Sequence, residues 1–468
     1  MELFECKFNE EQPKYITIYK NIKNLILKEK IEEGEKLPSI RNLSKLLKVN
    51  NVTVINAYKK LEEEGYAVQK IGSGTYAKRK ESVRGFRKEY IKIFKNALND
   101  GKEKYVDFTG EGTCVDYFSV EAFKNIINAV LDRDGAEALV YQETLGYLGL
   151  RKSINDFFWN NKLSDEDILV VSGAQQGIDI VCKSIINVND NVIVEKPTYS
   201  GALSVFKWKK ANILEVNILE DGADLEEFEK ILKRYKIKCF YVMSYFQNPT
   251  GISYSLEKKK RILELAEIYD FYIVEDDYLS ELIYNESLSY NSFKSLDKSD
   301  RVIYIKSFSK IFLPGIRLGY LISPVKFIDN MKNSKINTDI STSSLMQRTL
   351  DLYINKGYWK DYIKKLNTLY LDKYRFMKNS IENTLRDSVS FIDPKGGLSF
   401  YLKINPKINM DSLKLFYECK KENVLITPGV LFYKFPHEGK GHFKLSFSQL
   451  SKEEIQKGME IIKNVLNS

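Results

Sequence analysis

The sequence has few cysteines and no long uncharged apolar stretch. Its five cysteines, among 468 residues, are scattered and lack CxxC spacing, so neither a zinc site nor a disulfide framework is expected and no metal is predicted. Charged residues interrupt each apolar stretch before it reaches the roughly 18 residues that a membrane-spanning helix needs. The opening residues, MELFECKFNEEQPKY, are acidic where a signal peptide would be basic and then apolar. We therefore expect a cytoplasmic protein with no membrane partner.

Positive charge is concentrated in the first quarter of the chain. Residues 1–105 hold 23 Lys and Arg against 15 Asp and Glu, whereas residues 106–468 hold 49 against 48. A basic end on a nearly neutral body favours contact with a polyanion, although it is also consistent with a role in solubility alone. The length favours at least two domains, because domains usually run to about 100–200 residues.

The basic end has the pattern of three helices followed by a hairpin. Residues 15–31 carry apolar side chains at helical spacing, Pro38 suits the first turn of a second helix, and Asn50 is a good N-cap for a third. Two extended runs then flank the glycines of YAVQKIGSGTYAKR. The spacing predicts a helix-turn-helix with a β-wing, although two helices joined by a tight turn are also a common packing motif.

The segment GEKLPSIRNLSKLLKVNNVTVINAYKKLEEEGY, followed by GSGTY, resembles the winged helix-turn-helix of the GntR family. That resemblance implies binding to double-stranded DNA, with side chains at the start of the second and third helices and in the wing making the contacts. The family usually has Ser-Arg where this chain has Asn50-Asn51, so no base preference follows. The implied DNA-binding residues are Ser39, Arg41, Asn50, Asn51, Thr53, Lys70, Ser73 and Thr75.

We interpret a charged stretch at residues 80–105 as a linker. After it, the pattern of apolar residues in the sequence changes. Short β-branched or aromatic runs alternate with helical periods, which predicts a mostly parallel sheet covered on both faces. Such sheets bind ligands at the carboxyl ends of their strands. The predicted strands are residues 167–173, 191–197, 238–246, 271–276 and 302–309.

Each predicted strand ends in polar residues of a different kind, in SGAQQG, PTYSG, QNPTG, EDDY and SFSK. An amine, an arginine near a helix-end anion cradle, a carboxylate, an aromatic ring and a phenol or amide donor are the set that holds pyridoxal 5′-phosphate. Each motif alone is more often structural. Lys310 would form the Schiff base, Asp276 would pair with the pyridine nitrogen and Tyr199 would stack on the ring. Tyr278 and Asn248 would bond the ring hydroxylate, and the phosphate would be held by Arg317, Ser307, Ser309, Ala174 and Gln175.

The order of these motifs from about residue 106 onward resembles fold-type I aminotransferases, as do PKGGLSFYL, ITPGVLFY and FKLSFSQLSKEEIQKGMEII. The resemblance implies an α/β domain with a smaller α+β C-terminal subdomain. It also implies that Tyr141, in YQETLGYLGLR, reaches the phosphate of a neighbouring subunit. Lys444 stands where the family has an arginine that grips the substrate α-carboxylate. Lys444 is therefore the candidate group for an effector carboxylate, without the two-pronged geometry of arginine.

A GntR-type winged helix joined to an aminotransferase-like domain resembles the MocR family of transcriptional regulators. We expect a DNA-binding domain at residues 1–79, a linker at 80–105 and a cofactor-binding and dimerisation domain at 106–468. Membership implies a head-to-tail homodimer that senses an amine, an amino acid or the cofactor itself, and Lys444 favours the cofactor. The alternatives are an aminotransferase with a secondary DNA-binding module and a DNA-bridging protein without a ligand. His437 and His442 are expected in loops.

Overall fold

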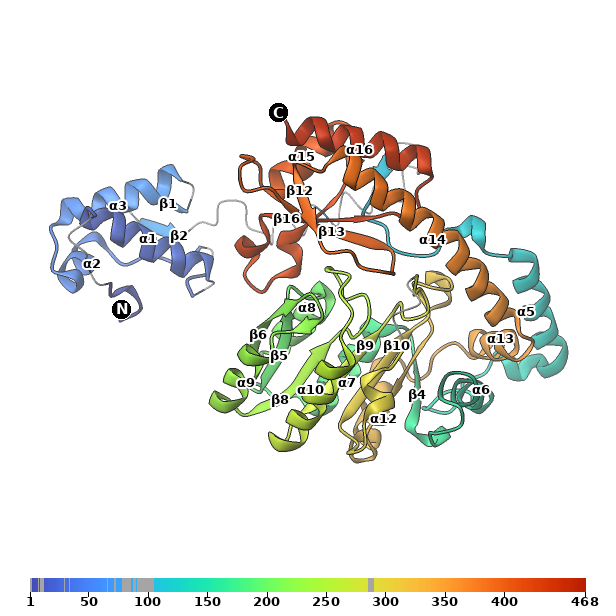
Figure 1. The fold of residues 1–468 in the computed structure, drawn as a ribbon. Coiled ribbons are helices and arrows are strands. Elements are labelled where there is room, and N and C mark those ends of the chain that lie inside the picture. Colours follow the sequence, from blue (N-terminus) through green and yellow to red (C-terminus); the bar gives the residue numbers. More distant parts are fainter. Residues whose placement is uncertain are drawn as a thin grey trace. The chain divides into compact units, whose positions relative to one another are not determined.

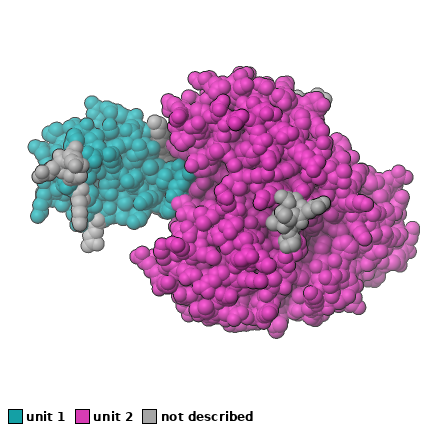
Figure 2. All heavy atoms as spheres, in the orientation of Figure 1, with its two compact units in different colours: residues 1–104, 435–438 teal, residues 105–434, 439–468 magenta. Residues whose placement is uncertain are grey.

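The computed structural model describes residues 2–6, 8, 12–28, 30–32, 34–64, 66–70, 73–77, 86, 90, 105–284 and 290–468. The chain divides into two compact units, residues 1–104 with 435–438 and residues 105–434 with 439–468 (Figure 2). Most of the predicted linker at residues 80–105 lies outside the described residues. Within the described ranges, none of the helices is both long and apolar enough to cross a lipid bilayer.

The smaller unit has three helices and a hairpin among its described residues. They are α1 (Lys14–Leu27), α2 (Ile40–Leu47), α3 (Asn51–Glu63), β1 (Ala67–Lys70) and β2 (Gly74–Ala77) (Figure 1). The side chain of Ser39 caps α2 and that of Asn50 caps α3, and each such cap stabilises a helix by about 1 kcal/mol. The strands pair antiparallel, with Lys70 opposite Gly74. The predicted helix-turn-helix and wing are present.

The first helix is shorter than the sequence pattern predicts. We expected a helix to residue 31, but α1 ends at Leu27. The backbone N–H groups of Lys30 and Ile31 both bond to the carbonyl of Leu25, at 2.9 and 3.4 Å, so the chain leaves the helix there. Ile31 is fully buried in the core of this unit. Its periodicity therefore reports burial rather than a continuing helix.

An eight-stranded sheet organises the described part of the larger unit, in the order β4-β11-β10-β9-β8-β5-β6-β7. Strands β10, β9, β8, β5 and β6 run parallel, whereas β11 is antiparallel to both β10 and β4. Helices flank the sheet (Figure 1), which explains why its central strands are buried on both faces. The strands are β4 (Ile168–Val171), β5 (Asn191–Lys196), β6 (Asn212–Leu219), β7 (Gly222–Ala223), β8 (Ile237–Val242), β9 (Tyr272–Asp277), β10 (Val302–Ser307) and β11 (Gly319–Ile322).

The mostly parallel sheet confirms the predicted fold class, and the largest error in a predicted strand boundary is at the end of the third strand. The third predicted strand was to reach residue 246, but β8 ends at Val242. Beyond it, the Met243 amide donates to the Glu195 carboxylate at 3.3 Å and the Ser244 hydroxyl bonds to Glu275. Side chains thus replace a strand neighbour there.

A second, antiparallel sheet of four strands, in the order β12-β13-β16-β15, forms the described part of the predicted C-terminal subdomain. Its strands are β12 (Val389–Phe391), β13 (Ser399–Ile404), β15 (Thr427–Pro428) and β16 (His442–Ser446). A short parallel pair joins β3 (Val106–Asp107) to β14 (Val424–Leu425). The helices of the larger unit are α5 (Val120–Asp134), α6 (Leu148–Trp159), α7 (Ala174–Ile185), α8 (Ser200–Trp208), α9 (Leu225–Arg234), α10 (Leu256–Ile268), α11 (Phe293–Leu296), α12 (Ile328–Asp339), α13 (Ser344–Asn355), α14 (Tyr358–Thr384), α15 (Ser412–Lys421) and α16 (Lys452–Leu466).

Candidate functional site

An anion cradle lies where β4 passes into α7. Gly173, with φ of 97°, is the N-cap of α7, and Arg317 donates from Nη2 to the Ser172 carbonyl at 2.6 Å. A Cβ on Gly173 would lie 3.2 Å from Arg317 Nη2 and 3.5 Å from Ser309 Oγ. The Ser309 hydroxyl is buried with no hydrogen-bond partner among the described residues. A guanidinium, an unpartnered hydroxyl and a helix N-terminus gathered around a glycine fit a phosphate group.

The other phosphate-binding candidates lie in the same elements. Ser307 is the last residue of β10, and its Oγ accepts from the Ser309 backbone N–H at 3.3 Å. Ala174 and Gln175 are the first two residues of α7, whose first-turn N–H groups have no partner within the helix. These positions agree with the sequence prediction, and the phosphate contact itself stays a prediction.

Lys310 is located one turn beyond the end of β10. Its Nζ donates to the backbone carbonyl of Glu111 at 2.7 Å. Burial lowers the pKa of the Lys310 amine, while the negative charge of Glu111 acts in the opposite direction. A buried lysine with a lowered pKa has the character required of a nucleophilic amine.

Two adjacent carboxylates at the end of β9 have separate partners. Asp276 accepts from the Tyr241 hydroxyl at 2.6 Å through Oδ2, while its Oδ1 is buried without a partner in the described chain. Burial raises the pKa of Asp276 to about 7. Asp277 is instead paired with Lys306 at 3.1 Å and accepts from Tyr304 at 2.7 Å. Asp276 therefore has an oxygen available for a cofactor nitrogen, whereas Asp277 is occupied.

The predicted ring contacts lie near Asp276. Burial raises the pKa of the Tyr199 phenol to about 12. The charges of Asp276 and Glu111 add to that rise and the charge of Arg317 opposes it, so these groups are all within electrostatic range of the ring. Tyr278 is buried, and its hydroxyl donates to the Phe246 carbonyl at 2.8 Å.

Asn248 connects this group of residues to the predicted effector group. Its Oδ1 accepts from Lys444 Nζ at 3.3 Å, and its Nδ2 donates to Glu111 at 3.5 Å. Lys444 also forms an ion pair with Glu111 at 2.8 Å, and the two side chains are only 6% and 4% exposed. Glu111 was not predicted from the sequence, because it lies in the loop after β3 with no strand motif to mark it.

Three other residues singled out from the sequence have different surroundings. Tyr141 is 79% exposed, and its predicted role toward a neighbouring subunit stays a prediction. His437 lies in the short 3-10 turn Pro436–Gly439. His442 was expected in a loop, which was wrong, because it is the first residue of β16 and its ring stacks on Tyr401 at 5.2 Å. Burial lowers the pKa of His442 to about 4, so the ring is neutral at physiological pH.

Among the predicted DNA-contacting residues of the smaller unit, Ser39, Arg41, Asn50 and Asn51 are all exposed, and the side chains of Ser39, Asn50 and Asn51 also make hydrogen bonds within the unit. Arg41 is exposed on α2. Ser39 Oγ accepts from the Asn42 N–H at 3.2 Å and Asn50 Oδ1 from the Val52 N–H at 3.1 Å, so both side chains act as helix caps. Asn51 Oδ1 accepts from the Ser44 hydroxyl at 2.5 Å, a contact between α2 and α3.

The remaining predicted DNA-contacting residues lie in α3, the predicted recognition helix, and in the wing formed by β1 and β2. Thr53 is half-buried in α3, next to Val52, which is 58% exposed. Lys70 ends β1, and beyond it residues 71 and 72 lie outside the described chain. The Ser73 hydroxyl is 2.5 Å from the Tyr76 hydroxyl, and Thr75 is buried at 8% exposure. The exposed Val52, at the start of α3, was not predicted.

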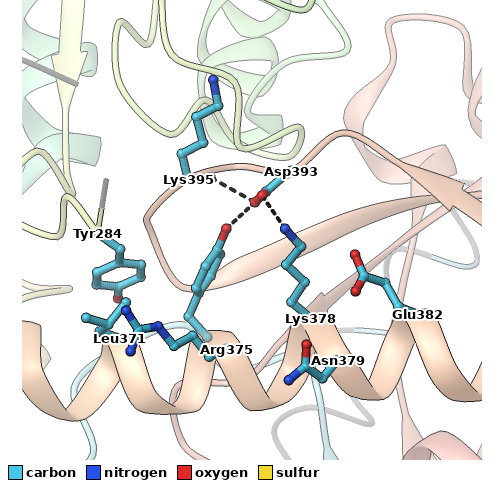
Figure 3. A pocket seen from close by; sticks show the side chains of 9 residues that line it. Tyr284, Leu371, Arg375, Lys378, Asn379, Glu382, Asp393 and Lys395 are labelled. Carbon is cyan, nitrogen blue, oxygen red and sulfur yellow. Dashed lines mark hydrogen bonds and ion pairs between the residues drawn. The ribbon is translucent and has the colours of Figure 1, made fainter. Parts of the chain in front are cut away.

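A separate cavity of about 790 Å³ lies beside α14 (Figure 3). Asp393 accepts there from Lys378 Nζ at 2.7 Å and from the Lys395 N–H at 3.2 Å. Its described lining includes none of the residues predicted from the sequence; they are Tyr284, Leu371, Tyr374, Arg375, Lys378, Asn379, Glu382, Asp393 and Lys395. The cavity is thus distinct from the group of residues around Lys310.

Comparison with known proteins gives two family matches. Residues 114–462 match the model of aminotransferase class I and II, and residues 14–77 match that of bacterial regulatory proteins of the gntR family. Aromatic-amino-acid aminotransferase 1 of Thermococcus litoralis is 30% identical over 73% of this chain and 83% of its own length. The HTH-type transcriptional regulator YdfD of Bacillus subtilis is 27% identical over 96% of both chains.

Among solved structures, the kynurenine aminotransferase of Pyrococcus horikoshii superimposes with a TM-score of 0.76 at 28% identity. The match covers 81% of this chain and 94% of that one. The aminotransferase likeness is thus confined to the larger part of the chain, whereas the likeness to the regulator extends over both parts.

Proposed function

The chain belongs to the aminotransferase class I and II family and carries a GntR-type helix-turn-helix, and from this we propose that it is a pyridoxal 5′-phosphate-dependent transcriptional regulator of the MocR type. The observation that carries the proposal is the set of groups around Gly173: an arginine, a hydroxyl with no partner in the described chain and a buried amine nearby, in a chain that also has a DNA-binding module. We further propose that DNA affinity responds to the cofactor or to an amine that joins it.

Each residue of the site has a distinct task in this proposal. When bound, pyridoxal 5′-phosphate supplies an aldehyde that condenses with amines and a ring that withdraws electrons. Arg317, Ser309 and the first N–H groups of α7 hold the phosphate. Asp276, through its unpartnered Oδ1, holds a proton on the ring nitrogen. Lys310 supplies the amine that anchors the group.

Further support for the ring contacts comes from the buried hydroxyls and amides beside Asp276. Tyr199 lies within electrostatic range of Asp276 and Arg317, the residues proposed to hold the ring nitrogen and the phosphate of the cofactor. Its phenol ring would therefore be near enough to stack on the cofactor ring. Tyr278 and Asn248 would supply a phenol and an amide to the ring oxygen, for which the Tyr278 hydroxyl would turn from the Phe246 carbonyl and Asn248 Nδ2 from Glu111.

The assembly and setting of the protein are also part of the proposal. We keep the division into a DNA-binding domain at residues 1–79, a linker at 80–105 and a cofactor-binding domain at 106–468. Proteins of the aminotransferase fold are typically dimers, and we propose a head-to-tail homodimer in which Tyr141 reaches the partner's site. The two DNA-binding modules of the dimer would then bind two half-sites of an operator. We propose that the protein is located in the cytoplasm.

The test is fluorescence anisotropy of the full chain on its own upstream DNA, at fixed salt because phosphate contacts make affinity steeply salt-dependent. The cofactor is removed and then restored, with and without added amine. A shift in affinity that Lys310→Ala abolishes, and that Lys403→Ala on the exposed side of β13 preserves, supports the proposal. DNA affinity that stays the same in all states refutes it.

The lowered pKa of the Lys310 amine also suits a second function, an aminotransferase with a secondary DNA-binding module. The measurement that separates the two is sustained release of a keto acid from an amino acid by the cofactor-loaded protein. Sustained turnover supports the enzyme, whereas its absence together with an amine-dependent DNA affinity supports the regulator.

A further inference from the structure

The carboxylate of Glu111, which belongs to the chain itself, is paired with Lys444, the group predicted to bind an effector carboxylate. Glu111 Oε1 lies 2.8 Å from Lys444 Nζ and also accepts from the Ser399 hydroxyl at 2.8 Å. Its Oε2 is 3.5 Å from Asn248 Nδ2. One carboxylate therefore contacts a cation, a hydroxyl and an amide, which together form a built carboxylate-binding site.

This internal carboxylate is held next to the reactive amine. The backbone carbonyl of Glu111 accepts from Lys310 Nζ at 2.7 Å. Burial acts to raise the pKa of Glu111, but the charges of Lys444 and Lys310 and the hydrogen bonds from Lys444 and Ser399 together keep that pKa below its ordinary value. Glu111 is therefore ionised at neutral pH, beside the position where a ligand amine must arrive.

The charge of Lys444 is consequently already neutralised. The Lys444 ammonium also lies 3.3 Å from Asn248 Oδ1 and 5.3 Å from the centre of the Phe432 ring, so its described contacts surround it. An amino acid at Lys310 would bring its α-carboxylate against the buried anion of Glu111, whose side chain is only 4% exposed. Like charges brought together in such a place are strongly disfavoured.

We propose that Glu111 replaces the α-carboxylate of a ligand, so that the site accepts primary amines whose amine-bearing carbon carries no carboxylate and rejects α-amino acids. This inference rests on the proposed function, since it assumes that amines reach the cofactor at Lys310. The pair formed by Glu111 and Lys444 then determines specificity rather than binding the effector carboxylate.

The test compares two ligands that differ only in the carboxylate, 3-methylbutylamine and L-leucine. Each is titrated into the cofactor-loaded full chain while the absorption spectrum of the bound cofactor is recorded. We expect the amine to change the spectrum at a concentration about 100-fold lower than L-leucine does, from the cost of opposing like charges. Equal responses, a stronger response to L-leucine or no response to the amine would overturn the inference.

A variant series tests the role of the carboxylate independently. Glu111→Gln keeps the shape of the side chain, removes its charge and leaves Lys444 free, so the concentration of L-leucine needed should fall about tenfold or more. Adding Lys444→Met to Glu111→Gln should cancel that gain. The control variant Glu382→Gln, at the cavity beside α14, should leave the concentrations needed of both ligands unchanged. An L-leucine response that Glu111→Gln does not strengthen contradicts the proposal.

Two features keep the outcomes separable. The comparison of ligands on the wild-type chain needs no variant, so a misfolded Glu111→Gln protein would not prevent the decision. The spectra are recorded without DNA, so a protein that discriminates the ligands but binds no DNA would refute the proposed regulator and retain this specificity. A protein whose DNA affinity responds to L-leucine as readily as to the amine would support the proposed regulator and refute this specificity.

Discussion

Replacing Lys444 by methionine isolates the energetic role of the buried ion pair. The variant removes the ammonium that lies 2.8 Å from Glu111 while keeping a side chain of similar length. Glu111 is then left as a buried carboxylate with the Ser399 hydroxyl at 2.8 Å as its main remaining hydrogen bond. We expect a loss of stability well beyond that of an exposed lysine.

The size of the loss follows from the burial of both partners. Their side chains are 6% and 4% exposed, and removing one member of a buried pair costs about 3–5 kcal/mol. The bond to Ser399 and the charge of Lys310 still stabilise the anion, so we expect about 3 kcal/mol, the lower end of that range. Removing both charges, with Glu111→Gln and Lys444→Met together, should cost about 1 kcal/mol or less, because replacing a whole buried pair is often neutral.

The loss should depend on pH in a definite direction. In the wild type the pKa of Glu111 is held below its ordinary value of 4.5, so its pairing contributes stability above that pH and loses it in acid. Without Lys444, we expect burial to dominate and to raise the pKa of Glu111, so the penalty should grow as the pH rises above 4.5. The difference in unfolding free energy between wild type and variant should therefore be large at pH 8 and shrink toward pH 5.

Urea unfolding followed by tryptophan fluorescence measures this difference in the appropriate part of the chain. The three tryptophans, Trp159, Trp208 and Trp359, all belong to the larger unit, which also contains the ion pair. A single variant as stable as the double variant, or a difference that does not change between pH 8 and pH 5, would refute the reasoning. It would mean that Glu111 is solvated or protonated in the folded chain.

Three further predictions concern the cofactor and DNA. Arg317→Lys should weaken cofactor affinity about 10- to 100-fold through loss of a two-pronged phosphate contact, as measured by absorbance titration, with exposed Arg386→Lys as an unaffected control. In the cofactor-free protein burial raises the pKa of Asp276 to about 7, so wild-type stability should fall as the pH rises from about 4 to 7 whereas that of Asp276→Asn should not; parallel urea midpoints at pH 5.5 and 8 would contradict this. Arg41→Ala should reduce DNA affinity for all sequences and lower the salt slope by about one, as measured by anisotropy at several salt concentrations, whereas Lys414→Ala in α15 should change neither quantity.

The sequence predicted those parts of the fold that depend on local pattern. The five predicted strands are present because short β-branched runs bounded by turns are typical of buried parallel strands. Strands β6, β7 and β11 of this sheet were not predicted; the four residues of β11, Gly319–Ile322, pair on both sides with the distant strands β10 and β4. The end of β8 at Val242 was also missed, since it depends on the distant carboxylates of Glu195 and Glu275.

The same distinction applies to the site. Asp276 and Lys310 could be found because each lies at or just beyond the end of a recognisable strand. Glu111 could not, because it lies in a loop and reaches Lys310 and Lys444 across 199 and 333 residues of chain. Its one trace in the sequence was indirect: Lys444 stands where the resembling family has an arginine.

The replacement of the family's arginine by Lys444 has one consequence when Lys444 is considered alone and another when its ion pair with Glu111 is considered. A lysine in place of an arginine predicts a weaker grip on a ligand carboxylate, because an ammonium lacks the two parallel donors of a guanidinium. With Glu111 at 2.8 Å, the same lysine already has its anion. Lys444 is then already paired and not merely a weaker ligand for a carboxylate. An amino acid must compete with the Glu111 carboxylate, which the chain holds in place. A ligand that brings no carboxylate to that position meets no such competition.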